Sequence, residues 1–341
     1  MMKAVGLYQY LPIENEQSLL DVIIDKPEAP QGHDLLVEIK AISVNPVDTK
    51  IRAPKEQTET APRVLGWDAA GEVVATGPDV EHYKVGDRVY YAGDITRAGS
   101  NSEFQLVDER IVGKMPSSLD FAQAAALPLT SITAWEALFD RMGISAEGLD
   151  AGKSLLIIGA AGGVGSIATQ LAKQIAKLNV IATASRPDTV DWVKTMGADQ
   201  VINHRNAIDE ELKAINTPQV DYILCLNATD QHWSAMANAI APQGHICSIV
   251  ETEQPVNLGL LKSKSASFSW EFMFTRAMFQ TADMIEQQTL LNKVADGIDL
   301  GILQGTMKEV LMPISAENLR KIHAFLESGH AIGKVVLAGW D

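Results

Sequence analysis

The stretch Ser154-Leu-Leu-Ile-Ile-Gly-Ala-Ala-Gly-Gly-Val-Gly165 decides the fold class of this chain. An apolar run rich in Leu and Ile ends in a turn dense in glycine, and a helical pattern follows at once over residues 166–176. A strand, a glycine turn and a helix in this order are typical of segments that bind a nucleotide diphosphate. The alternative interpretation is a tight strand-to-helix turn that holds no ligand.

The glycines of this turn have separate predicted roles. Gly162 lets the main chain approach a pyrophosphate closely, because a Cβ at this position would collide with it. Gly165 lets the following helix pack tightly on the strand, and the positive end of that helix then faces the phosphates. The match to G-x-G-x-x-G is imperfect, since Ala160 stands where the first glycine is expected. We predict that the cofactor contacts the turn residues Ala161, Gly162, Gly163, Val164 and Gly165.

Length and charge narrow the class of protein. A chain of 341 residues is too long for one compact core and predicts two domains. The net charge of −15 would repel nucleic acid and anionic membranes, so neither is an expected partner. No apolar run reaches the roughly 18–20 residues that span a bilayer. Residues 1–10 resemble an edge strand and lack the apolar region of a signal peptide, which predicts a cytoplasmic protein.

The pattern of the chain changes at about residue 151. Residues 1–120 show short alternating segments separated by Gly and Pro, typical of β-structure. Strands and helices then alternate, which predicts an α/β domain with a doubly wound parallel sheet of strand order 3-2-1-4-5-6. Its expected strands lie at 154–159, 179–184, 200–203, 220–226, 244–250 and 265–270. Cys225 and Cys247 fall in two of them and are interpreted as inert core thiols.

The C-terminal part is expected to rejoin the β-rich domain. The spacing of apolar residues predicts an amphipathic helix over 315–326, with Ser315 as its N-cap and Gly329 after its end. A final strand over 333–337 is expected to return to the β-rich sheet. The predicted domains are therefore 1–128 with 278–341, and 129–277.

Several motifs, in this order along nearly the whole chain, resemble the medium-chain dehydrogenase/reductase superfamily. They are Asn45-Pro-Val-Asp48, Gly66-Trp-Asp-Ala-Ala-Gly71, Val85-Gly-Asp-Arg-Val89, Ala125-Ala-Leu-Pro128, Ala160-Ala-Gly-Gly-Val-Gly165 and Gly333-Lys-Val-Val-Leu337. Within it the chain resembles the quinone oxidoreductase branch, and more closely the group called zinc-type alcohol-dehydrogenase-like. The resemblance implies a GroES-like substrate domain, a Rossmann cofactor domain, and a homodimer or homotetramer.

The zinc of alcohol dehydrogenases is not expected here. By the resemblance, a Cys ligand falls where this chain has Asn45, and a His-Glu pair falls at Trp67-Asp68. The four-cysteine structural lobe has no counterpart in the sequence. Zinc needs thiolate or imidazole ligands in a tetrahedral set, and Asp68 alone offers one oxygen ligand. We therefore expect no metal at this position.

NADP(H) is the expected cofactor. The second predicted strand ends in Ser185-Arg186, where NAD enzymes usually place an acidic residue for the ribose hydroxyls. A guanidinium can grip the 2′-phosphate of NADP(H) instead. The alternative is that Arg186 is a solvated loop residue and Asp188 contacts the ribose. His204, after the third strand, is a further candidate near the phosphate.

Other residues are predicted near the nicotinamide. The resemblance points to Thr130, Thr133, Asn227, Ser248 and Ile249. Asn227 and Ser248 also fit because they follow strands, and doubly wound sheets bind ligands at the carboxyl ends of their strands. Lys334 is a weaker candidate, and its alternative is a surface lysine on an edge strand.

The predicted reaction is zinc-independent transfer of a hydride from NADPH to a quinone or an α,β-unsaturated carbonyl. Without a metal, an enolate or hydroquinone anion is easier to stabilise than an alkoxide, because its charge is delocalised. The predicted catalytic residues are Asn45, Lys50 and Asp68, with Trp67, Trp270 and Phe274 as candidate pocket residues. The alternatives are a crystallin-like NADPH-binding protein with little turnover and, less favoured by the residues, a zinc alcohol dehydrogenase.

Overall fold

The computed structural model describes residues 1–340, which form two compact units. The first unit contains residues 1–132 and 274–341, and the second contains residues 133–273. Each unit has its own sheet structure. Within residues 1–340, no helix combines the length and the apolar character that crossing a bilayer requires.

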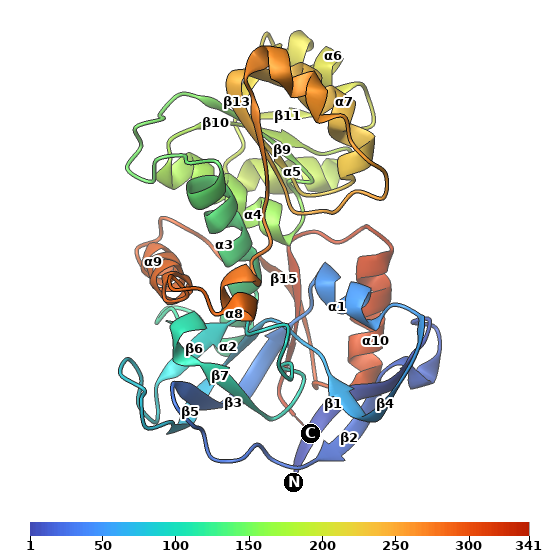
Figure 1. Cartoon of the computed structure of the whole chain (residues 1–341), viewed down its shortest axis with the longest axis vertical. Coiled ribbons are helices and arrows are strands. Elements are labelled where there is room, and N and C mark those ends of the chain that lie inside the picture. Colours follow the sequence, from blue (N-terminus) through green and yellow to red (C-terminus); the bar gives the residue numbers. More distant parts are fainter. Residues whose placement is uncertain (341) are drawn as a thin grey trace. The chain divides into compact units, whose positions relative to one another are not determined.

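The second unit is built on a six-stranded parallel sheet (Figure 1). Its strands run in the order β11-β10-β9-β12-β13-β14, and every neighbouring pair is parallel. Numbered along the unit, this is 3-2-1-4-5-6, so the predicted doubly wound order is confirmed. The strands are β9 (Ser154–Ile158), β10 (Asn179–Thr183), β11 (Gln200–Ile202), β12 (Val220–Cys225), β13 (Ile240–Ser248) and β14 (Ser267–Trp270).

Both faces of this sheet are covered. Leu155, Leu156 and Ile157 are successive residues of β9 and are all buried, although neighbours along a strand point to opposite faces. A parallel sheet covered on both faces is why its strands are continuous apolar runs rather than alternating ones. The helices between the strands are α4 (Gly163–Gln170), α5 (Pro187–Thr195), α6 (Ile208–Ala214) and α7 (Thr229–Ala239).

The first unit is built around a seven-stranded sheet in which distant parts of the chain lie side by side. The C-terminal strand β16 pairs with β3, so red and blue segments neighbour each other in Figure 1. The order is β15-β16-β3-β5-β6-β8, with β7 paired to β3. The strands are β3 (Asp34–Ser43), β5 (Ala69–Thr76), β6 (Arg88–Tyr91), β7 (Phe104–Asp108), β8 (Val112–Lys114), β15 (Met307–Leu311) and β16 (Lys334–Ala338). The predicted return of the last strand is confirmed.

The N-terminal strand differs from its prediction. β1 (Met2–Tyr10) is the centre of a three-stranded sheet, between β2 (Leu20–Ile24) and β4 (Lys55–Val64), so its prediction as an edge strand was wrong. Ala4 and Val5 are both buried although successive side chains point to opposite faces, so both faces of this strand are covered here. The pairing of β1 with β4 is a long-range contact, which cannot be predicted from the local sequence pattern of either strand.

Helices of the first unit begin at recognisable residues. Ser315 precedes α10 (Ala316–Glu327), and its side chain accepts a hydrogen bond from the backbone N–H of Asn318, as predicted. Gly329, just beyond the helix, has a φ of +71°, a conformation that glycine adopts without strain. The remaining helices are α1 (Pro46–Arg52), α2 (Phe121–Ala125), α3 (Pro128–Trp135), α8 (Thr275–Phe279) and α9 (Glu286–Asp299).

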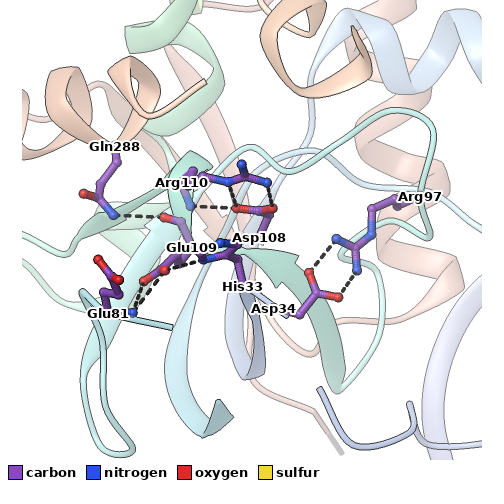
Figure 2. Close-up of polar contacts among 8 residues, drawn as sticks. All are labelled: His33, Asp34, Glu81, Arg97, Asp108, Glu109, Arg110 and Gln288. Carbon is purple, nitrogen blue, oxygen red and sulfur yellow. Dashed lines mark hydrogen bonds and ion pairs between the residues drawn. The ribbon is translucent and has the colours of Figure 1, made fainter. Parts of the chain in front are cut away.

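A polar cluster around Glu109 ties loops to the β-rich sheet (Figure 2). The Glu109 carboxylate is 1% exposed and accepts hydrogen bonds from the backbone N–H groups of Glu81 at 3.1 Å and His82 at 2.9 Å. His33 Nδ1 lies 3.0 Å from the same carboxylate, which raises the pKa of His33. Two ion pairs lie beside it in the figure: Asp34 with Arg97, and Asp108 with Arg110.

We predict that Glu109→Gln lowers the free energy of unfolding by about 1–3 kcal/mol, because its amide NH₂ would face backbone donors. Urea unfolding followed by tryptophan fluorescence measures the change. The part of the unfolding free energy that comes from the contact between His33 and Glu109 is fully present below a pH of about 6.5. It is lost as pH rises through the raised pKa of His33. Glu81→Gln is the matched control, since this side chain is exposed. Equal stability of both variants would contradict the prediction.

Candidate functional site

The glycine turn after β9 has the geometry expected of a phosphate-binding segment. Gly162 is the N-cap of α4 in an extended conformation, so the unpaired N–H groups at the start of this helix follow it directly. A Cβ added to Gly162 would lie 3.6 Å from the nearest atom, the carbonyl oxygen of Gly159. A Cβ on Gly165 would lie 2.4 Å from the carbonyl oxygen of Ala160. The two glycines therefore differ: space is open at Gly162 and is filled by the protein itself at Gly165.

Arg186 lies at the carboxyl end of β10, as the N-cap of α5. Its Nε atom is 3.3 Å from Oδ1 of Asp188, and its side chain is 28% exposed. Asp188 also accepts a hydrogen bond from the backbone N–H of Thr189, so it acts as a first-turn acid of α5. Ser185 is half-buried beside them.

The environment of His204 disfavours a positive charge on its imidazole. Burial lowers the pKa of His204, and the positive charges of Arg205 and Arg186 lower it further. Its buried Nδ1 atom has no hydrogen-bond partner among residues 1–340. Arg205 was missed by the sequence analysis, although its place directly after His204 was a usable signal. Imidazole and two guanidinium groups thus gather beyond β10 and β11, and this combination favours an anion.

The ends of β12 and β13 hold the other predicted cofactor residues. Asn227 is exposed just after β12, and Ile249 is half-buried just after β13. Ser248 is buried, and its hydroxyl lies 2.7 Å from Oγ1 of Thr229, which donates to the carbonyl of Val250 at 2.6 Å. The side chain of Ser248 therefore contacts the protein itself at the carboxyl ends of β12 and β13. Thr229 had no recognisable signal in the sequence.

In the first unit, Asn45, Asp68 and Lys334 form one buried hydrogen-bond network. The Asn45 amide nitrogen donates to Oδ2 of Asp68 at 2.7 Å and to the carbonyl of Trp67 at 3.3 Å. The Lys334 ammonium donates to Oδ1 of Asn45 at 2.6 Å and lies 3.2 Å from Oδ2 of Asp68. All three side chains are at most 4% exposed. The alternative of Lys334 as a surface residue on an edge strand is wrong, because β16 lies between β15 and β3.

The charges of this network lie in an environment that opposes ionisation. Burial raises the pKa of Asp68 and lowers the pKa of Lys334, and each group's charge counteracts the effect on the other. Burial also raises the pKa of Asp48 to about 7, against the backbone N–H of Asn45 and the charge of Lys334. The one ammonium therefore faces two buried carboxyl groups.

The remaining predicted residues separate into exposed and buried groups. Lys50 is exposed on α1, whereas Thr130 and Thr133 are buried on α3. Trp67 and Phe274 are both buried and contact each other edge to face, with ring centroids 6.2 Å apart. Trp270 belongs to the second unit, is 46% exposed and packs against Phe268.

Comparison with known proteins places this geometry in a family. Residues 31–117 match the alcohol dehydrogenase GroES-like domain, and residues 196–337 match the zinc-binding dehydrogenase domain. A zinc-type alcohol dehydrogenase-like protein of Staphylococcus epidermidis is 44% identical over 98% of this chain and 99% of its own length. The chain belongs to the medium-chain dehydrogenase/reductase superfamily. It is thus an oxidoreductase of this superfamily with an NAD(P)-binding fold.

Solved structures of this superfamily share the whole fold. A Rhizobium etli protein assigned as a candidate zinc-dependent alcohol dehydrogenase has a TM-score of 0.95 and 50% identity, with 100% of this chain and 98% of that chain covered. The quinone oxidoreductase of Escherichia coli, in complex with NADPH, has a TM-score of 0.79 and 25% identity, with 98% and 99% covered.

Zinc, which several names in this superfamily imply, does not fit the residues of this member. Asp68 is the one side chain among Asn45, Trp67 and Asp68 that commonly binds zinc. Both of its oxygens already accept hydrogen bonds, Oδ1 from the backbone N–H of Leu129 at 2.7 Å and Oδ2 from Asn45. The ammonium of Lys334 adds a positive charge that would repel a cation. Asn45, Trp67 and Asp68 therefore do not form a zinc site.

Two glycine variants separate cofactor binding from packing. We predict that Gly162→Ala folds normally but binds a nicotinamide dinucleotide more weakly, because its new methyl group occupies the open space at the turn. Gly165→Ala is expected to lose about 1–3 kcal/mol of stability, because its methyl group overlaps the backbone of Ala160. NADPH titration and thermal unfolding of both variants measure the two effects. Unchanged NADPH affinity in Gly162→Ala would contradict the assignment of this turn.

Proposed function

We propose that this protein is a zinc-independent, NADPH-dependent reductase of quinones or α,β-unsaturated carbonyl compounds. The observation that carries the proposal is the Asn45–Asp68–Lys334 hydrogen-bond network, which occupies the position where the resemblance to zinc alcohol dehydrogenases places metal ligands. Bound NADPH would supply a hydride to the β-carbon of an enone or to a quinone. The resulting enolate or hydroquinone anion would take a proton from water, which balances the reaction.

The choice of substrate class follows from the charge that the site must stabilise. Hydride transfer to a simple ketone concentrates negative charge on one alkoxide oxygen, for which many enzymes use a Lewis acid. An enolate or a hydroquinone anion spreads that charge over several atoms. Placement of the reacting atoms can supply roughly 7–11 kcal/mol, and one hydrogen-bond donor at the oxygen about 3–4 kcal/mol. These contributions suit an enone or a quinone better than a ketone.

Lys50 is the better candidate for the donor at the substrate oxygen. Asn45 was the other predicted donor, but both of its amide hydrogens are used within the protein, by Asp68 and the carbonyl of Trp67. Its side chain is also 1% exposed. Lys50 is exposed on the same α1 segment and carries a positive charge. The proposal therefore assigns the carbonyl oxygen to Lys50 and a supporting role to Asn45.

The preference for NADPH rests on the groups beyond β10 and β11. Arg186 and Arg205 provide positive charge, and His204 has a buried nitrogen without a partner among the described residues. A 2′-phosphate would accept hydrogen bonds from such groups, whereas the diol of NADH lacks that charge. The carboxylate of Asp188 is held by Arg186 and by the start of α5, which leaves it less suited to the ribose.

The second candidate function is that of a protein that binds NADPH but has little turnover. The buried, fully bonded Asn45 is what a non-catalytic NADPH-binding protein would tolerate, whereas the exposed Lys50 favours an enzyme. Steady-state oxidation of NADPH and of NADH, with a quinone and a short conjugated enone, distinguishes them. We also propose that the protein is a homodimer or homotetramer, and light scattering on the same sample tests this.

The cofactor preference has a direct test at Arg186. We predict that Arg186→Gln raises KM for NADPH by about 10- to 100-fold, because a hydrogen bond to a charged phosphate is lost. KM for NADH is expected to change little. Arg110→Gln is the matched control, because Arg110 is a half-buried arginine of the first unit that is likewise paired with an aspartate, Asp108. Equal losses with NADPH and NADH would show that Arg186 does not recognise the 2′-phosphate.

The donor assignment is tested at Lys50. We expect Lys50→Met to lower kcat for the enone by about 10²- to 10³-fold, the loss typical of one oxyanion donor. NADPH affinity should stay within a small factor of wild type, since the lysine is assigned to the substrate. Lys84→Met, an exposed lysine of the same unit, controls for the loss of surface charge. Full activity of Lys50→Met would remove this residue from the mechanism.

A further inference from the structure

The ammonium of Lys334 is directed into the protein and has an acceptor for each of its three hydrogens. It donates to the carbonyl oxygen of Val44 at 2.7 Å and to Oδ1 of Asn45 at 2.6 Å, and it lies 3.2 Å from Oδ2 of Asp68. Lys334 is 4% exposed. All three acceptors belong to the first unit, so this charge is used internally rather than held ready for a phosphate.

Two of these acceptors stand at the beginnings of two helices. Asn45 is the N-cap of α1, and its backbone N–H donates to Oδ2 of Asp48 at 2.7 Å. Asp68 accepts a hydrogen bond at Oδ1 from the backbone N–H of Leu129, the second residue of α3, at 2.7 Å. The first N–H groups of a helix have no partner within the helix, so such contacts fix where it begins. One ammonium thus links the starts of α1 and α3.

These two helices carry residues that the proposed function needs. Lys50 is on α1, one turn beyond the network, and Thr130 directly follows Leu129 on α3. The proposed substrate donor and a predicted cofactor residue therefore lie on two helices, α1 and α3, and the N-terminal ends of both helices are linked to the ammonium of Lys334. This step of the argument rests on the proposed function.

Charge explains why the link needs a lysine. Asp48 and Asp68 are both buried, at 1% and 0% exposure, and Lys334 is the cation that acts on both. A neutral side chain at this position would leave the two carboxyl groups facing each other in the interior without a counter-charge. Asn45 would also lose the donor to its amide oxygen, and the helix starts could then shift independently.

We propose that Lys334 is a positioning residue whose ammonium, through Asn45 and Asp68, holds the starts of α1 and α3 in one arrangement and so fixes the place of Lys50, the proposed substrate donor. This role differs from the direct cofactor contact implied by the resemblance. It also separates Lys334 from the catalytic groups, because Lys334 touches neither substrate nor cofactor in this account.

Chemical rescue of Lys334→Ala tests the proposal. Propylammonium replaces the atoms that the substitution removes, and n-propanol is the neutral control of the same length. We expect kcat with an enone at saturating NADPH to fall about 100-fold, the loss that a small misplacement of reacting groups produces. We expect propylammonium, and not n-propanol, to restore it in a saturable manner. The wild type should respond to neither compound.

Hydrogen exchange followed by mass spectrometry provides a readout that is independent of turnover. Positioning predicts faster exchange over residues 45–52 and 128–135 in Lys334→Ala, reversed by propylammonium, with the first-unit strands at 2–10 and 88–91 unchanged. A general increase across the first unit would indicate a merely structural lysine and overturn the proposal. Unchanged kcat, or a rise in KM for NADPH alone, would also overturn it.

Two further variants keep the test decisive. If Lys334→Ala fails to fold, two other variants replace it: Lys334→Arg keeps the positive charge, and Lys334→Met keeps only the aliphatic part of the side chain. Positioning requires slower hydrogen exchange in α1 and α3, and a higher kcat, in the arginine variant than in the methionine variant. Equal behaviour of these two variants would overturn the proposal. If the wild type binds NADPH but reduces neither quinone nor enone, the proposed function fails, and the exchange measurements alone decide the role of Lys334.

Discussion

A buried ammonium that faces two buried carboxyl groups is the constraint on which the β-rich unit depends. Moving three ionisable groups out of water is unfavourable, and the arrangement is tolerated because the hydrogen-bond donors and acceptors match. Lys334 provides three donors, Asn45 relays between lysine and carboxylate, and Asp68 receives donors at both oxygens. The contacts come from β16, α1, the segment before β5, and α3, so one network joins four parts of the fold.

The same network underlies the chemistry that we propose for this member of the superfamily. Where the zinc enzymes have thiolate and imidazole ligands, this chain has an amide and an indole, and its carboxylate is already occupied. The ammonium of Lys334 is bonded to acceptors within the protein and is not presented to a substrate oxygen. The proposed reactions leave a delocalised anion, whose smaller demand for stabilisation would be met by positioning of the reacting atoms and by one exposed lysine.

Local pattern was sufficient for the nucleotide-binding unit. The strands of a buried parallel sheet are continuous apolar runs, and right-handed crossovers leave few possible orders, so all six strands and the order 3-2-1-4-5-6 were predictable. Ser315 and Gly329 marked the last helix because caps depend on nearby backbone groups. The strand at residues 2–10 was misplaced because its second neighbour, β4, lies some fifty residues further along the chain.

By itself, therefore, the sequence determined the two kinds of sheet, the glycine turn, the absence of zinc-type ligands at 45 and 67, and the basic residues beyond β10. Each of these depends on residue type and on spacing within one segment. Only the tertiary structure decided that Lys334 is buried, that it bonds Asn45 across 289 positions, and that both amide hydrogens of Asn45 are already used. The physical reason is that hydrogen-bond saturation depends on which distant groups meet in space, and residue spacing along the chain does not encode it.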